Sequence, residues 1–167
     1  MINPAATPFI TEAPVLLVQA RGLMTPDEVD FWQRVRMALR EQRNELVLIT
    51  HHDPKAPMDV PYVRVPNSLD NLWQAGAGDC SAALSKCWPG EKENAFLLQR
   101  EIAWWGGNQD PTGRRRRRYA LYIASAFYAQ VLRQVRPSLT IIWNGTHAQE
   151  IILATLCESI GTPVSYI

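Results

Sequence analysis

The sequence has few cysteines and no long apolar run, and each shortage counts against a familiar class of protein. Its three cysteines, Cys80, Cys87 and Cys157, form no CxxC pair and are odd in number, so we expect neither a disulfide framework nor a zinc site. This cysteine usage is typical of a reducing, cytoplasmic setting. No stretch approaches the roughly 20 apolar residues of a membrane-spanning helix. The first residues also lack the basic segment and apolar core of a signal peptide.

An excess of either charge is also missing. The chain has 17 Lys and Arg residues against 16 Asp and Glu residues, a net charge of +1, which argues against nucleic acid as a partner. The sequence also has no GxGxxG fingerprint, no Walker A loop, no HExxH motif and no DxD pair. We therefore expect no dinucleotide cofactor, no bound metal and no metal-dependent transferase of the GT-A type.

What the sequence does contain is an alternation of strand-like and helix-like segments. Residues 1–14 are rich in proline and predict an extended lead-in. Val15–Ala20 and Leu46–Thr50 are short apolar runs typical of buried parallel strands. Between them, Thr25 precedes a proline and two acids, which predicts a helix that begins at this cap and ends near Gln42. The unit should have a right-handed crossover.

The middle of the chain is less regular. Pro61–Val65 predicts a third, short strand, and the compositions of Glu91–Trp105 and Arg114–Arg136 favour helices. A loop rich in glycine, residues 106–113, separates these two helices. Trp104 and Trp105 offer either a sugar-stacking platform or a core anchor with one exposed ring.

The last thirty residues form the clearest pattern. Leu139–Trp143 predicts a buried strand, and Asn144-Gly145 ends it. Thr146 is expected to cap a helix, with Gln149 completing a capping box. Gly161 and Pro163 should stop this helix before a strand over 164–167. Residues 15–167 therefore predict an α/β fold: one Rossmann-like three-layer domain with a mainly parallel sheet of four or five strands.

This C-terminal block resembles the capsule polysaccharide synthesis family, which includes bacterial Kdo transferases and related sugar transferases of the GT-B type. Three parts carry the resemblance: Ile141-Ile142-Trp143-Asn144-Gly145, the helix with Glu150, Ala154 and Glu158, and Ile160-Gly161-Thr162-Pro163-Val164. The rest of the chain agrees with the family only in the alternation of its predicted strands and helices.

The resemblance implies the N-terminal domain of a bacterial glycosyltransferase in capsule or related surface polysaccharide biosynthesis. Such an enzyme transfers a sugar from a nucleotide-sugar to a glycan acceptor, in a cleft between two domains. The N-terminal half generally lines the acceptor side, and the other half binds most of the nucleotide-sugar. The chain would then be part of a longer protein and incomplete as a catalyst. The location implied is cytoplasmic and peripheral at the inner membrane. No catalytic residue can be carried over.

Ligands of open α/β sheets bind at the carboxyl ends of the strands, and several polar or small residues follow the predicted strands. An arginine there could bind a carboxylate or phosphate, a histidine could act as a base, and a helix N-terminus favours an anion. Each also has a structural interpretation, as a loop residue or a helix cap. The expected substrate-binding residues are Arg21, Gly22, His51, Asn144, Gly145, Thr146 and His147.

Five consecutive arginines, Arg114, Arg115, Arg116, Arg117 and Arg118, stand at the start of a predicted helix. They oppose the helix dipole there, so they predict either an exposed basic run or a patch for an anionic lipid or glycan. Two other functions stay open beside the transferase. One is a non-enzymatic α/β binding or regulatory domain that docks an anionic partner through this run. The other is a small α/β enzyme for a phosphorylated metabolite.

Overall fold

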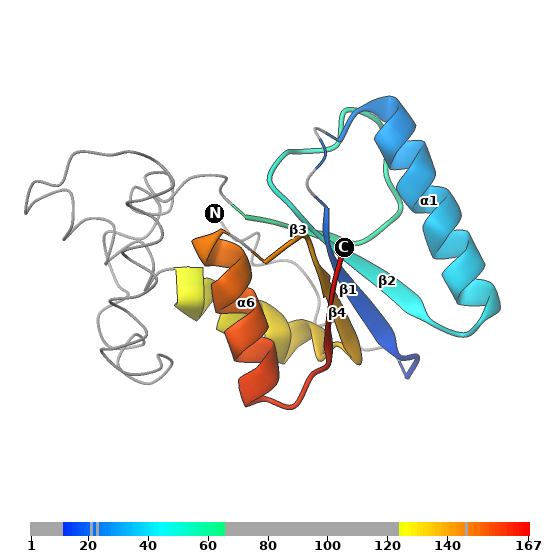
Figure 1. Ribbon diagram of the computed structural model, residues 1–167. Coiled ribbons are helices and arrows are strands. Elements are labelled where there is room, and N and C mark those ends of the chain that lie inside the picture. Colours follow the sequence, from blue (N-terminus) through cyan, green and yellow to red (C-terminus); the bar gives the residue numbers. More distant parts are fainter. Residues whose placement is uncertain (1–11, 21, 23, 66–123, 146) are drawn as a thin grey trace, which may run out of the picture.

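The computed structural model describes residues 12–20, 22, 24–65, 124–145 and 147–167 (Figure 1). Residues 124–135 are helical, which agrees with the second half of the helix expected over Arg114–Arg136. The helix expected over Glu91–Trp105, the paired tryptophans and the arginine run lie outside the described residues. The other elements are β1 (Val15–Ala20), α1 (Pro26–Glu41), β2 (Glu45–Thr50), β3 (Tyr62–Arg64), β4 (Leu139–Ile142), α6 (Ala148–Ser159) and β5 (Val164–Tyr166).

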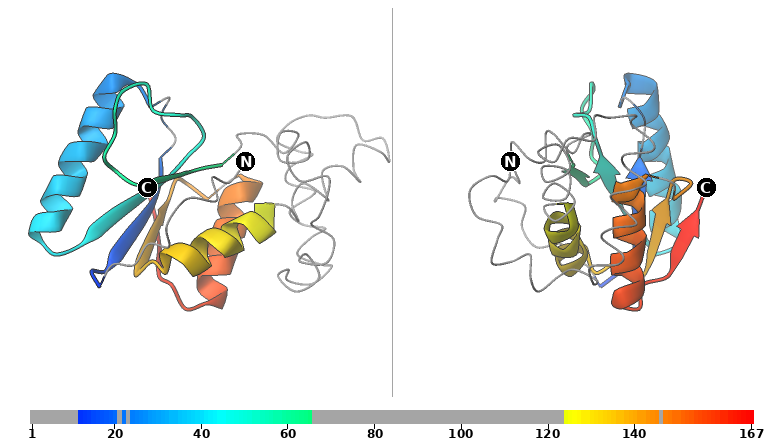
Figure 2. Two further views of the ribbon diagram at one scale, coloured as in Figure 1. Left: turned by 180° about the vertical axis from the view of Figure 1, so that it is seen from behind. Right: turned by 60° about the vertical axis from the view of Figure 1, so that its left-hand side comes forward.

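The five strands form one sheet in the order β3-β2-β1-β4-β5, and every pairing is parallel. From β1 the chain adds strands in one direction, and from β4 it adds them in the other. With right-handed crossovers, this reversal puts the connecting helices on opposite faces. Accordingly, α1 covers one face, while α6 and helix 124–135 cover the other (Figure 1, Figure 2). The predicted Rossmann-like three-layer α/β fold is confirmed.

The core consists of two apolar layers, one on each face of the sheet. Leu17, Val47 and Ile142 belong to the layer under α6 and helix 124–135, whereas Val18 and Leu48 belong to the layer under α1. Side chains of a strand alternate between faces, so a central strand covered on both sides must be apolar almost throughout. All six residues of β2 are buried for this reason.

Helix α1 begins as its sequence predicts. Thr25 is the N-cap, Pro26 is the first helical residue, and Glu28 completes a capping box. The backbone N–H of Thr25 donates to Glu28 Oε2 at 2.8 Å, and Glu28 N donates to Thr25 Oγ1 at 3.4 Å. These bonds satisfy N–H groups that have no partner within the helix. The helix ends with Gln42 as its C-cap, and Arg43 turns the chain with a φ of 60°.

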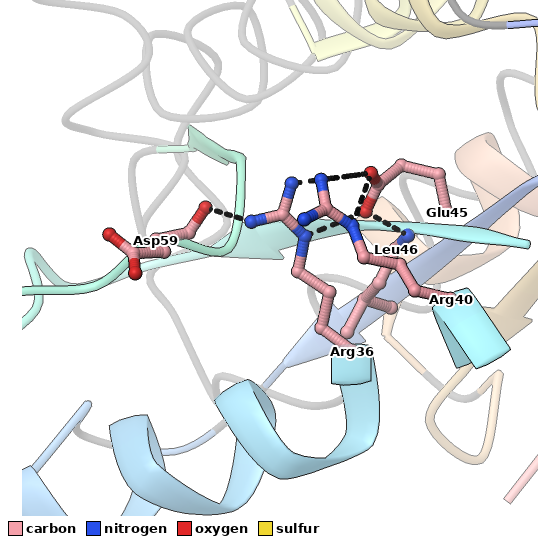
Figure 3. Close-up of polar contacts among 5 residues, drawn as sticks. All are labelled: Arg36, Arg40, Glu45, Leu46 and Asp59. Carbon is pink, nitrogen blue, oxygen red and sulfur yellow. Dashed lines mark hydrogen bonds and ion pairs between the residues drawn. The ribbon is translucent and has the colours of Figure 1, made fainter. Parts of the chain in front are cut away.

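Glu45, the first residue of β2, ties the end of α1 to the sheet (Figure 3). Its Oε1 accepts from Arg36 Nε at 2.7 Å, and its Oε2 accepts from Arg40 Nη2 at 2.7 Å. Its Oε1 also accepts from the backbone of Leu46, and Arg36 donates in addition to the carbonyl of Asp59. Burial opposes ionisation of this carboxyl, but the hydrogen bonds from both arginines outweigh it and lower its pKa from 4.5 to about 2.

None of the helices within the described ranges is both long and apolar enough to cross a membrane.

Candidate functional site

The carboxyl ends of β1 and β4 lie side by side at the point where the strand order reverses. Leu16 pairs with Leu139, and Val18 pairs with Ile141. The loops that leave these two strands diverge toward helices on opposite faces, which opens the ligand-binding position of doubly wound sheets. The tertiary structure therefore brings the predicted residue Gly22, after β1, to the same edge as Asn144, Gly145 and His147, after β4. Arg21 and Thr146 lie outside the described residues.

Met24, which lies after β1 and before the cap of α1, has a constrained backbone conformation. Met24 has a φ of 56°, in the left-handed region that residues other than glycine rarely adopt. Its side chain is completely buried in the layer under α1, and its carbonyl accepts from Lys55 N at 2.9 Å. Burial and this hydrogen bond together hold the unfavourable backbone conformation. The backbone at Met24, just before α1, is thus fixed.

Gly22 belongs to the same loop and lies against the Glu28 carboxylate. A Cβ at this position would collide with Glu28 Oε1. We predict that Gly22→Ala displaces the Glu28 side chain from its capping box and lowers the free energy of unfolding by about 1 kcal/mol. Chemical denaturation checks this. In a Glu28→Ala background the same substitution should have little effect, and an equal loss in both backgrounds would contradict the explanation.

The turn after β4 depends on Gly145. This residue has a φ of +67°, and a Cβ there would lie 2.7 Å from Cε1 of the Tyr166 ring. Its N–H donates to the carbonyl of Trp143. Asn144 is exposed beside it. The turn is therefore packed on β5, and it presents Asn144 at the carboxyl edge of the sheet.

Helix α6 begins one residue later than the sequence predicts, so the expected capping box of Thr146 and Gln149 is wrong. His147 is the N-cap, and its N–H donates to Glu150 Oε2 at 3.2 Å. Gln149 is instead turned into the core, where its Oε1 accepts from the Tyr128 hydroxyl at 3.1 Å. Packing against helix 124–135 selects this register, because the hydroxyl buried there needs a partner.

The first turn of α6 differs chemically from a simple anion-binding helix terminus. Glu150 is completely buried there and accepts a hydrogen bond from the backbone of His147. A carboxylate at this place competes with a phosphate for the N–H groups of the helix end and repels its charge. The turn is better suited to ligand groups that donate hydrogen bonds.

His51 follows β2 at the same edge of the sheet. Its Nδ1 lies 3.0 Å from the carbonyl oxygen of Val65. A carbonyl oxygen only accepts, so Nδ1 must donate, and Nε2 is the basic nitrogen of the neutral ring. One strand separates His51 from the turn after β4, because β1 lies between β2 and β4. His51 is therefore at the margin of the site, with the exposed ion pair of Asp53 and Arg64 at 2.8 Å nearby in the chain.

Sequence reasoning missed the buried polar residues of this edge. Gln19, Tyr128, Gln149 and Glu150 are each at least nine-tenths buried, and all lie on the face covered by α6 and helix 124–135. One signal was available, because Gln19 interrupts an otherwise apolar strand. Glu150 gave no such signal, since a glutamate in the first turn of a helix is ordinary. In the parts of the chain that the structure describes, no three His, Cys, Asp or Glu residues are grouped to hold a metal.

Comparisons with known proteins yield no family. No protein-family model and no curated protein matches the chain. Solved structures with a similar fold include a protein assigned as UDP-N-acetylglucosamine 2-epimerase from Listeria monocytogenes, with 6% identity, a TM-score of 0.41, and coverage of 94% of this chain and 31% of that one. The chain thus spans about a third of that protein's length.

Two further structures belong to other enzymes. Pantothenate synthetase from Thermus thermophilus has 12% identity and a TM-score of 0.45, with coverage of 95% of this chain and 56% of that chain. Tyrosyl-tRNA synthetase from Leishmania major has 10% identity and a TM-score of 0.41, with coverage of 96% of this chain and 26% of that chain.

Proposed function

We propose that this chain is the N-terminal domain of a glycosyltransferase of the GT-B type, which acts in capsule or related surface polysaccharide biosynthesis. Its substrate-binding edge is formed by the loops after β1 and β4, with Gly22, Asn144, Gly145 and His147. The observation that carries the proposal is the reversal of strand order between β1 and β4 in an all-parallel sheet. Crevices at such a reversal are where doubly wound domains bind their ligands.

The segment that resembles capsule polysaccharide synthesis proteins supports the more specific part of the proposal. Its expected strand, Asn-Gly turn, helix and second strand correspond to β4, residues 143–145, α6 and β5. The turn of this segment is also the part of it that lies at the reversal point. Asn144 and Gly145 thus belong both to the residues that carry the resemblance and to the residues at the proposed substrate-binding edge.

The proposal extends to location and partners. The transferase would act on the cytoplasmic side, peripheral at the inner membrane, with a nucleotide-sugar and a glycan acceptor bound through a second domain. The run Arg114–Arg118 would contact an anionic lipid or glycan. Because this run lies outside the described residues, its role stays a prediction from charge alone.

Turnover by the natural gene product that contains this chain tests the proposal. We expect release of nucleotide from one member of a panel of CMP-, UDP- and GDP-sugars when a glycan acceptor is present. Asn144→Ala should lower kcat/KM about tenfold or more, because it removes a polar group from the substrate-binding edge. Its matched control is Asn44→Ala, at the opposite, amino end of the sheet. There the Asn44 side-chain amide donates a hydrogen bond to the carbonyl of Gln42 at 3.1 Å.

The control variant should retain the wild-type kcat/KM. Absence of turnover with every donor would overturn the transferase and leave a binding domain as the better account. If the two asparagine substitutions changed kcat/KM equally, the turn after β4 would not be part of the substrate-binding site.

A further inference from the structure

Gln19 is a buried polar side chain in the central strand of the sheet. It lies in β1, and 2% of it is exposed. Its Oε1 has no hydrogen-bond partner among the described residues. A buried acceptor without a partner destabilises the folded state, and most buried polar atoms in native proteins avoid this condition. Such an atom beside a ligand-binding edge points to a role in the ligand-bound state.

The position of Gln19 follows from the strand register. Val15 and Leu17 face the layer under α6 and helix 124–135, so alternation puts Gln19 on that face too. Since Val18 pairs with Ile141, Gln19 is level with Ile142, the last residue of β4. It is therefore one residue from the carboxyl end of β1, next to the strand that leads into α6.

The first turn of α6 begins at the same edge and covers the same face. It contains Glu150, which is completely buried and accepts from the backbone of His147. In this layer the Tyr128 hydroxyl of helix 124–135 donates to Gln149 Oε1. Gln19 Oε1 thus lies at the same edge and on the same face of the sheet as the carboxyl group of Glu150.

We propose that Gln19 binds a hydroxyl of a neutral sugar, with its Oε1 accepting the hydrogen bond at the reversal point between β1 and β4. The inference rests on the proposed function and deepens it by naming the chemical class that this side of the site accepts. Sugar hydroxyls donate hydrogen bonds of the kind that Gln19 Oε1 can receive. An acidic sugar or a phosphate brings further acceptors and a negative charge toward Glu150, and both are unfavourable.

A pair of substitutions separates ligand binding from folding. Gln19→Met removes the acceptor but retains an unbranched side chain of similar length. The matched control is Thr50→Val, because Thr50 Oγ1 is also buried without a hydrogen-bond partner in the described part of the chain, and Thr50 is completely buried. Thr50 faces the α1 layer, like Leu46 and Leu48. Neither substitution should lower the melting temperature, because each removes an oxygen whose burial is uncompensated.

Binding is measured by saturation-transfer NMR with methyl galactoside, methyl N-acetylglucosaminide and methyl glucuronide as probes. We expect a neutral glycoside to bind the wild-type chain more tightly than the glucuronide does. Gln19→Met should weaken that binding about 3- to 10-fold, the effect of one hydrogen bond. Thr50→Val should leave it unchanged.

Three other outcomes would overturn the inference, and they can be told apart. Equal binding by wild type and Gln19→Met removes Gln19 from the site, while the transferase proposal stands if turnover is found. Binding of no glycoside, or preference for the glucuronide, rejects the neutral sugar. A lower melting temperature for Gln19→Met with unchanged binding assigns Gln19 a structural role, such as holding a buried water. Conversely, sugar binding that depends on Gln19 in a protein without turnover supports the inference and rejects the transferase.

Discussion

Glu45→Gln should lower the free energy of unfolding at neutral pH by about 3 kcal/mol, which is a large fraction of the stability of a domain of this size. The carboxylate is mostly buried and accepts hydrogen bonds from Arg36 and Arg40. A glutamine can accept fewer of these bonds and leaves two guanidinium groups without their counter-charge. The lowering of the Glu45 pKa from 4.5 to about 2 gives a similar magnitude, at about 1.4 kcal/mol for each unit.

The same ion cluster determines how the protein responds to acid. The pKa of Glu45 is lower in the folded state than in the unfolded chain, so its contribution is complete above about pH 4.5 and is lost as the pH falls toward about 2. Urea denaturation followed by circular dichroism between about pH 7 and about pH 3 measures this. The difference in stability between wild type and Glu45→Gln should shrink steadily as the solution becomes more acidic.

The control is an exposed ion pair on the same helix. Arg34 and Asp30 lie 2.9 Å apart with side-chain exposures of 71% and 62%, so Arg34→Ala should change stability by no more than about 0.5 kcal/mol. A similar loss for Arg34→Ala and Glu45→Gln would mean that the end of α1 is not held by the Glu45 cluster. A difference between wild type and Glu45→Gln that does not change with pH would have the same meaning.

Gly145→Ala should be the most damaging small substitution at the candidate site, with a loss of about 2–3 kcal/mol in the free energy of unfolding and weaker ligand binding. Two costs add at this position. The backbone has a φ of +67°, and a Cβ would lie 2.7 Å from the ring of Tyr166. The turn after β4 would have to move, and Asn144 and His147 would move with it. Thermal denaturation and the glycoside titrations measure both effects.

Gly161 offers a matched control, because it separates the two costs. Its φ is +74°, but no atom lies within 4 Å of a Cβ built there. Gly161→Ala should therefore lose only the backbone part, about 1 kcal/mol. In a Tyr166→Ala background, the cost of Gly145→Ala should fall to about that of Gly161→Ala. If Gly145→Ala is no worse than Gly161→Ala in the wild-type background, the contact with Tyr166 does not constrain the turn.

Much of the fold could be predicted because its signals are local. The cap at Thr25, the following proline and Glu28 lie within one turn of helix, and they specify the start of α1 whatever surrounds it. The apolar runs that form β1, β2 and β4 likewise indicate strands covered on both faces. The structure changes these bounds by one residue at most: β2 begins at Glu45, and β4 ends at Ile142.

The candidate site could be predicted in position but less well in chemistry. The sequence indicated the turn after β4, since its Asn-Gly pair separates a strand from a helix. It misplaced the cap of α6, because Thr146 and Gln149 fit the capping pattern better than His147 and Glu150 do. Choosing between two such registers requires knowing that Gln149 meets the hydroxyl of Tyr128, 21 residues away in the chain.

The sequence by itself determined the helices and strands of the described residues, their order along the chain and the apolar character of the central strands, because these depend on residues a few positions apart. The tertiary structure alone decided that β1 lies beside β4. Next to this pairing, the Ser138 hydroxyl donates a hydrogen bond to the carbonyl of Val15, 123 residues away in the chain. It also decided that Glu45 meets two arginines and that Gln19 and Glu150 are buried at one edge. These features depend on how the layers pack, and no local pattern of residues encodes which distant side chains that packing brings together.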